Sequence, residues 1–127
     1  MPDLSDLIGV RFYTHGRSVS TGFDCYGLAI EVSRRFGHEL KDLWYRSSDA
    51  DTFAGNAGGM IERMAGMTER TDSCEPGNLV VFMQDGRMVH IGVMVGDDMF
   101  IHCDRHGVRI MRLSEYYREG ILYRWKI

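Results

Sequence analysis

The sequence predicts an α+β domain in which N-terminal helices, including the one that carries Cys25, pack on a C-terminal antiparallel sheet of about five strands. In the first half of the chain, apolar residues recur at helical spacing. In the second half, short apolar runs alternate with turn signals at residues 85–86 and 96–98. Helices followed by a meander of strands are typical of α+β proteins. At 127 residues we expect a single domain over 1–127.

Composition excludes several classes of protein. Hydrophobic residues make up 44% of the chain and charged residues 26%, the balance of an ordinary globular domain. The net charge of −3 argues against a nucleic-acid partner, because binding phosphates requires a concentrated basic surface. The sequence has no apolar run of about 20 residues, so we expect no membrane span. The N-terminus lacks a signal-peptide pattern, which predicts synthesis in the cytoplasm without a signal peptide.

The first elements are expected to be a helix, a loop and a second helix. A short opening helix that ends near Gly9 or in the loop beyond is predicted within residues 3–13 from the spacing of the apolar residues, which are Leu4, Leu7, Ile8 and Phe12. Residues 14–22 are polar and contain glycine, which indicates a loop. Asp24 is a good N-cap whose carboxylate can accept the Gly27 amide hydrogen, and Gly37 supplies a stop. The second helix therefore begins at Cys25.

The remaining elements follow from apolar runs and turn residues. Residues 38–51 are expected to be irregular and packed by their aromatic side chains. A helix is predicted within residues 52–67, where Met60, Ile61, Met64 and Met67 share one helical face. Strands are then expected over residues 79–83, 88–95, 99–103, 108–113 and 121–127, with one helical turn at 114–117.

Three cysteines and two histidines are the candidates for chemistry. Cys25, Cys74 and Cys103 are odd in number and form no C-x-x-C pair, so we expect free thiols. Cys25 is predicted at a helix start, where unpaired N–H groups and the helix dipole favour a thiolate. The alternative for Cys25 is a buried cysteine that only packs.

The histidine candidates lie on two predicted strands. Period-2 alternation puts Val89, Ile91, Val93 and Val95 on one face and His90 on the other. His102 shares a face with Phe100, so pairing of the two strands would let both histidines face the same way. A helix-start cysteine facing two sheet histidines is the geometry of a thiol protease, and Gly92 would leave room for a substrate backbone. The alternative for each histidine is a structural role, as expected for His15, His38 and His106 in loops or on the surface.

Four motifs resemble those of the NlpC-type papain-like cysteine peptidases. Residues 23–28 (FDCYGL) resemble that family's cysteine block, and residues 76–82 (PGNLVVF) resemble its P-G-D-L strand. Residues 89–96 (VHIGVMVG) are similar to its histidine strand, and residues 100–102 (FIH) with 107–108 (GV) resemble its closing segment. The resemblance runs from about Tyr13 to the C-terminus, with the motifs in the family's order.

The resemblance implies a papain-like fold and a set of catalytic roles. Cys25 would be the nucleophile, His90 the general base and His102 the group that orients His90. Tyr13 would match the tyrosine that helps the Cys25 N–H to hold the oxyanion. The resemblance also implies hydrolysis of peptidoglycan stem peptides without a cofactor, at the cell wall.

Further expectations concern the substrate and the setting. The resemblance implies that Asp24 can help to bind a substrate amine, and we count Tyr26 and Gly92 with it as substrate-binding candidates. Tyr26 stands where cell-wall remodelling members have serine, and an aromatic residue there is more similar to versions associated with phage tails. Phage tail proteins are therefore expected partners.

Two other functions stay open at this point. One is a catalytically silent module of the same fold that serves in tail assembly or in binding. The other is a metal site made of His90, His102, Cys103 and Cys74, although their spacing matches no zinc pattern. We therefore expect no metal.

Overall fold

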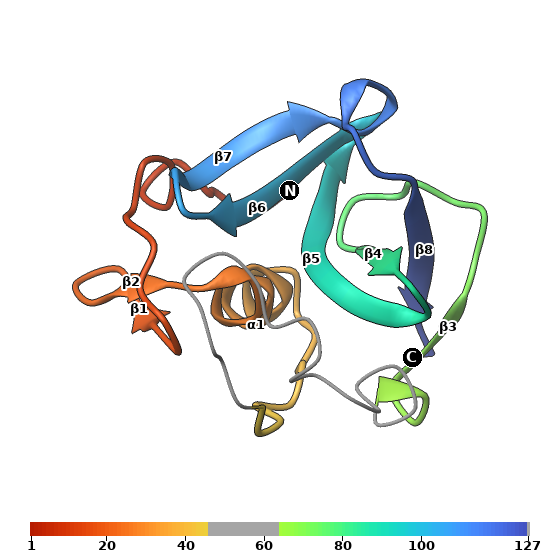
Figure 1. The fold of residues 1–127 in the computed structure, drawn as a ribbon, viewed down its shortest axis with the longest axis horizontal. Coiled ribbons are helices and arrows are strands. Elements are labelled where there is room, and N and C mark those ends of the chain that lie inside the picture. The colour runs from red at the N-terminus through yellow and green to blue at the C-terminus, as the bar shows by residue number, and fades with distance from the viewer. Residues whose placement is uncertain (46–63, 127) are drawn as a thin grey trace.

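The computed structural model describes residues 1–45 and 64–126, which form an α+β domain (Figure 1). The described part contains one α-helix, α1 (Cys25–Arg35), and a short 3-10 helix, η1 (Leu113–Glu115). A small sheet pairs β1 (Arg17–Ser18) with β2 (Gly22–Phe23). The large sheet has the order β3-β8-β4-β5-β6-β7, and every neighbouring pair in it is antiparallel. Its strands are β3 (Thr68–Arg70), β4 (Leu79–Gln84), β5 (Arg87–Gly96), β6 (Met99–Asp104), β7 (Gly107–Arg112) and β8 (Gly120–Trp125).

The predicted class is confirmed, with two corrections of number. The sheet has six strands rather than about five, because Thr68–Arg70 adds a strand beside β8. Helices are fewer than predicted, since α1 is the one α-helix in the described ranges. The helix expected within residues 52–67 lies mostly outside the described residues. Neither helix found in residues 1–45 and 64–126 has the length and apolarity that crossing a bilayer demands.

The predicted opening helix is wrong, because residues 5–9 form turns instead. The spacing of Leu4 and Leu7 arises from a turn in which the Leu7 N–H donates to the Leu4 carbonyl at 3.0 Å. The chain then runs beside the start of β7. There the Gly9 N–H donates to the Val108 carbonyl (3.0 Å), and the Val108 N–H donates to the Val10 carbonyl (2.9 Å). These tertiary hydrogen bonds replace the helical ones.

Local signals do set the bounds of α1. The Asp24 side chain accepts the Gly27 N–H at 2.7 Å, as predicted for an N-cap. At the other end Gly37 has φ +91°, and the His38 N–H donates to the Ser33 carbonyl at 2.9 Å. This left-handed glycine closes the helix in the way its sequence predicts. Cys25 is consequently held in the first turn of α1.

The side chains of β5 stop alternating between the two faces of the sheet just before His90. The β4–β5 hairpin turns at Asp85 and Gly86, both with positive φ, as predicted from the sequence. The register then shifts between Phe82 and Met83, so that Phe82 pairs with His90 and Met83 with Met88. Val89 falls between these pairs as an extra residue. The prediction that Val89 shares a face with Ile91 is therefore wrong.

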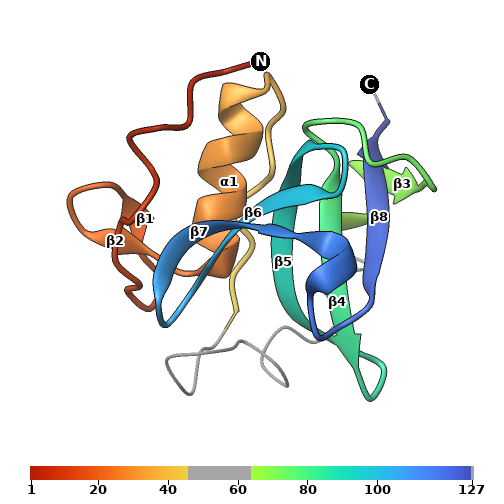
Figure 2. The same cartoon turned by 90° about the horizontal axis from the view of Figure 1, so that it is seen from above.

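The sheet has an apolar layer on each face. Ile91, Val93, Ile101 and Cys103 belong to a core shared with the buried residues of α1. Figure 2 shows α1 beside β5 and β6, the strands that it contacts most. The second cluster comprises Val80, Phe82, Val89, Met94 and Phe100, with Met111 and Tyr116 packed against it. Both candidate histidines lie on the side of this second cluster.

Candidate active site

His90 and His102 contact each other directly. The Nε2 atom of His90 lies 2.7 Å from Nδ1 of His102, and the two ring planes are inclined by 81°. His90 is 5% exposed and His102 is fully buried. The prediction that the two histidines face the same way on neighbouring strands is confirmed. The rings pack among Phe82, Phe100 and Tyr116, which exclude water from the pair.

Gly92 permits the approach of the two strands at the histidine pair. A Cβ atom at this position would lie 2.9 Å from the Ile101 carbonyl oxygen and 2.9 Å from Cδ2 of Phe100. It would also lie 3.4 Å from the Cβ of His102. Contacts under 3.0 Å to backbone cannot be accommodated without a shift of β6. Gly92 thus keeps His102 within reach of His90, and its proposed part in substrate binding stays a prediction.

Gly92→Ala is expected to destabilise the protein by about 2 kcal/mol, because overpacking forces β5 and β6 apart. Chemical denaturation followed by tryptophan fluorescence measures the loss. Gly96→Ala is the matched control on the same strand, because a Cβ there would meet only the Met99 Cβ at 3.9 Å. An equal effect of the two substitutions would contradict the steric role of Gly92.

Cys25 places its sulfur against the backbone of β5. The Ile91 and Tyr26 N–H groups donate to this sulfur, and Cys25 is 3% exposed. Ile91 directly follows His90, and it lies two residues before Val93, the first β5 residue paired with β6. The nucleophile candidate therefore lies near the strand segment that carries the base candidate. The predicted approach of Cys25 to the two histidines stays a prediction.

Burial outweighs the helix start in setting the charge of Cys25. Removal from water raises the pKa of the Cys25 thiol well above its usual value, and the neighbouring Asp24 carboxylate raises it further. The Ile91 and Tyr26 N–H groups lower it by less. The expectation of a thiolate in the resting protein is therefore wrong, because the same helix start that offers N–H groups is enclosed by the core.

Both histidines are also neutral near pH 7. Burial lowers the pKa of His90 to about 3, and the adjacent His102 lowers it further. Burial lowers the pKa of His102 to about 4, although Asp104 opposes this shift. Any reaction at this site consequently starts from a neutral thiol and a neutral imidazole pair.

Acid is expected to destabilise the fold through this pair. The unfolded chain binds protons at histidine near pH 6.5, whereas the folded pair binds them only near pH 4 and pH 3. The two histidines therefore make their full contribution to the free energy of unfolding above pH 6.5, and this contribution falls as the pH drops from 6.5 toward 4. Melting temperatures at pH 7 and pH 4.5 measure the loss. The double variant His90→Gln/His102→Gln should show a smaller loss than wild type, and an equal loss would contradict the assignment.

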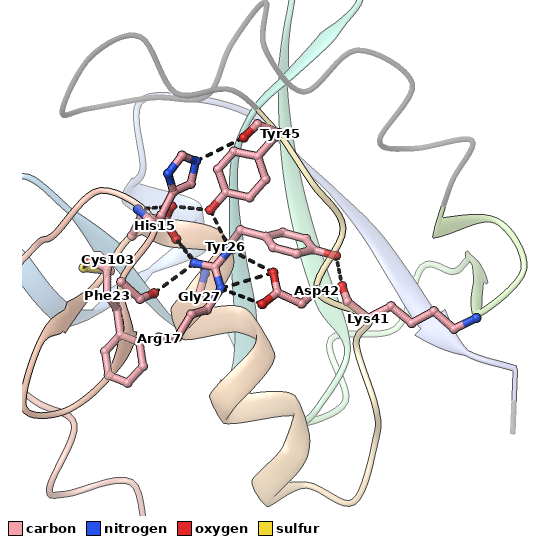
Figure 3. A network of polar contacts seen from close by, with 11 residues as sticks. His15, Arg17, Phe23, Tyr26, Gly27, Lys41, Asp42, Tyr45 and Cys103 are labelled. Carbon is pink, nitrogen blue, oxygen red and sulfur yellow. Dashed lines mark hydrogen bonds and ion pairs between the residues drawn. The ribbon is translucent and has the colours of Figure 1, made fainter.

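Asp24 is the centre of a buried polar network, and its partners His15, Arg17 and Tyr45 are labelled in Figure 3. Its Oδ1 atom accepts from the Gly27 N–H at 2.7 Å and from Nη1 of Arg17 at 3.0 Å. Its Oδ2 atom accepts from the His15 N–H at 3.1 Å and from the Tyr45 hydroxyl. The carboxylate before the nucleophile is thus surrounded by donors. A role for Asp24 in binding a substrate amine stays a prediction.

Arg17 and Tyr45 are members of this network that sequence reasoning missed. Arg17 donates from Nη2 to the Tyr45 hydroxyl at 3.0 Å and pairs with Asp42 at 3.0 Å (Figure 3). Tyr45 is 2% exposed and lies 21 residues from Asp24 along the chain. The expected packing of residues 38–51 by aromatics holds for Tyr45, whereas Trp44 is 72% exposed. Residues 46–51 of this segment lie outside the described residues. No short-range pattern links Tyr45 to Asp24.

The other predicted residues lie around the start of α1. The Tyr26 side chain is buried, and its hydroxyl donates to the Lys41 carbonyl at 2.6 Å. Tyr13 is 49% exposed, with the Arg11 guanidinium 5.3 Å above its ring. Cys103 packs in the core shared with α1 and donates its S–H to the Phe23 carbonyl at 3.1 Å, on the opposite face from His102. Substrate binding by Tyr26 and oxyanion binding by Tyr13 stay predictions.

Proteins of known type resemble this chain in sequence and in fold. The murein DD-endopeptidase MepS/murein LD-carboxypeptidase of Escherichia coli strain K12 is 28% identical over 119 residues, and its counterpart in strain O157:H7 matches equally. These matches cover 92% of the chain and 55% of each relative, so the chain spans about half the length of these curated relatives.

Two solved structures share the fold. The NlpC/p60 domain of the peptidoglycan hydrolase SagA superposes with a TM-score of 0.63 at 16% identity, covering 93% of this chain and 90% of that one. An NlpC/P60 family protein from Bacillus cereus ATCC 10987 gives 0.59 at 24% identity, covering 94% and 39%. The model of the NlpC/P60 family matches residues 9–125, and this chain therefore belongs to the NlpC/P60 family.

Proposed function

We propose that this protein is a cysteine peptidase that hydrolyses peptide stems of bacterial peptidoglycan through a thioacyl intermediate on Cys25. The observation that carries the proposal is the 2.7 Å contact between His90 and His102 beside the strand segment that holds the Cys25 sulfur. The names of the murein endopeptidases and of the peptidoglycan hydrolase that resemble this chain support the choice of substrate.

The proposed reaction starts with transfer of the Cys25 proton to His90 as the sulfur attacks the scissile carbonyl carbon. Because the thiol and the imidazole are neutral at rest, proton transfer accompanies attack rather than precedes it. The Cys25 N–H and the Tyr13 hydroxyl are the proposed oxyanion donors. His90 then gives its proton to the leaving amine, which departs and leaves the thioacyl enzyme.

In the second half of the reaction, water attacks the thioacyl carbon while His90 accepts a proton from it. The C–S bond breaks, the acid product leaves, and the proton returns to the Cys25 sulfur. His102 holds the His90 ring throughout, and Asp24, Tyr26 and Gly92 are the proposed substrate-binding residues. The cycle is closed without a cofactor.

The proposed place of action is the bacterial cell wall, and the proposed partners are phage tail proteins. Tyr26 supports the tail setting, because an aromatic residue directly after the nucleophile distinguishes this chain from members with serine there. Copurification with tail proteins from a phage lysate would support this setting. The tail setting would be contradicted if the protein were found only in cells that produce no tail particles.

Digestion of purified peptidoglycan tests the enzymatic proposal. Fragments separated by liquid chromatography and weighed by mass spectrometry are expected to show cleavage within the peptide stem. Acid quenching during turnover should trap a stem fragment on the tryptic peptide that contains Cys25. The proposal would be contradicted if the protein left the peptidoglycan of both Gram-negative and Gram-positive sacculi intact.

A catalytically silent binding module of the same fold is the second candidate. It is favoured by the burial of Cys25, which is 3% exposed and carries a neutral thiol. Such a module would sediment with sacculi and leave their stems uncut. The cosedimentation and digestion assays together separate the two functions.

A further inference from the structure

His102 contacts two side chains through its two ring nitrogens. Its Nδ1 atom faces Nε2 of His90 at 2.7 Å, and its Nε2 atom lies 3.1 Å from the thioether sulfur of Met111. Met111 is half-buried on β7, paired with Phe100 of β6, and it packs against the second apolar cluster. The chain of contacts therefore runs from β5 through β6 to β7.

Two proton arrangements could satisfy the contact between the two neutral histidines. In the first, the His90 Nε2–H donates to Nδ1 of His102, and His102 carries its own proton on Nε2. In the second, the His102 Nδ1–H donates to Nε2 of His90, and His90 carries its proton on Nδ1. Only the first arrangement leaves Nδ1 of His90 free to accept a proton.

Met111 discriminates between these arrangements. A thioether sulfur has no proton to donate but can accept a weak hydrogen bond. The first arrangement directs the His102 Nε2–H at the Met111 sulfur, which accepts it. The second directs the lone pair of Nε2 at the lone pairs of sulfur and forms no hydrogen bond. The contact at 3.1 Å thus favours the first arrangement.

We infer that Met111 is a positioning residue, whose sulfur fixes the tautomer of His102 and thereby leaves His90 unprotonated at Nδ1. The inference deepens the proposed function and rests on it, because an unprotonated Nδ1 is what a general base for Cys25 requires. Met111 itself touches neither the thiol nor the substrate in this scheme. It acts through His102, two side chains away from the proton that moves.

The surroundings explain why a weak acceptor suffices. Burial keeps both imidazoles neutral, so His102 holds one proton and places it where an acceptor lies. The rings of Phe82, Phe100 and Tyr116 pack against the histidines as aromatic neighbours. The charged groups that act on the pair are Asp104, Arg109 and Arg118. Beside these rings the Met111 sulfur, 3.1 Å from Nε2 of His102, is a polarisable acceptor.

The test is nitrogen NMR of the full chain labelled with 15N-histidine at pH 7, which distinguishes protonated from unprotonated ring nitrogens. His90→Gln and His102→Gln identify the two sets of resonances. In wild type we expect His102 protonated on Nε2 and His90 protonated on Nε2. A wild-type spectrum with His102 protonated on Nδ1 overturns the inference without any variant.

Met111→Leu keeps the volume and apolar character of the side chain but removes the acceptor. His102 is expected to populate both tautomers, and kcat for muropeptide hydrolysis should fall about threefold to tenfold with KM unchanged, as for loss of one neutral hydrogen bond. Met94→Leu is the matched control, because Met94 is buried in the same apolar cluster. It should leave both the spectrum and kcat as in wild type.

The outcomes separate the inference from the function on which it rests. An unchanged tautomer in Met111→Leu, or an equal change in Met94→Leu, overturns the role of Met111 whatever the activity. A changed tautomer with unchanged kcat overturns its role in the reaction. If wild type cleaves no peptidoglycan, the proposed function fails, and the spectra still decide whether Met111 sets the tautomer.

Discussion

Cys25→Ala is expected to lower kcat for muropeptide hydrolysis by at least about 10⁴-fold, because the substitution removes the atom that forms the thioacyl bond in the proposed mechanism. The fold should remain, since alanine is the best helix former and only the buried sulfur is lost. The Ile91 and Tyr26 N–H groups lose their acceptor, which should cost about 1 kcal/mol. Product analysis by mass spectrometry and thermal unfolding measure the two effects separately.

Cys103→Ala is the matched control for this experiment. Its sulfur is also buried and also makes a hydrogen bond, at 3.1 Å to the Phe23 carbonyl. It lies on the opposite face of β6 from His102, so hydrolysis should continue at near the wild-type rate once the variant is folded. Cleavage by Cys25→Ala at the wild-type rate would eliminate the thioacyl mechanism.

Asp24→Asn is expected to destabilise the protein by about 3 kcal/mol, the usual cost of breaking a buried ion pair. Four donors surround the carboxylate, and an amide offers them one oxygen and one opposing N–H₂ group. The Arg17 guanidinium would also lose its buried partner, whose side chain is 7% exposed. The free energy of unfolding in urea measures the cost.

Asp42→Asn provides the comparison for Asp24→Asn, because Asp42 pairs with the same guanidinium. The Asp42 side chain is 61% exposed, so its loss should cost less than about 1 kcal/mol. Equal costs for the two variants would show that burial of Asp24 contributes nothing to the network.

The sequence predicted those parts of the fold whose causes are local. An N-cap at Asp24 and a left-handed stop at Gly37 bound α1 as expected, because each acts through hydrogen bonds within a few residues. The hairpin turn at Asp85 and Gly86 was also predictable, since few residues adopt two successive positive φ angles. The elements that carry Cys25, His90 and His102 were also predicted, because each of the three residues lies in a helix or strand with clear local signals.

The predictions that were wrong concern features that depend on contacts between residues far apart in the sequence. The opening segment has helical spacing but turns to pair with Val108, about a hundred residues away, which no window of sequence contains. The extra residue at Val89 is set by a register shift against β4, and alternation alone does not reveal it. Burial of Cys25 depends on the whole core, so its charge could not be inferred from the helix start.

If the proposed function holds, the division of the candidate site between α1, β5 and β6 makes hydrolysis a measure of complete folding. A nascent chain that ends before β6 carries Cys25 and His90 but lacks His102, which contacts His90 at 2.7 Å in the folded protein. Such a truncated product should be inert toward the wall of the cell that makes it. Recovery of activity during refolding would then report closure of the sheet against the helix, independently of any spectroscopic probe.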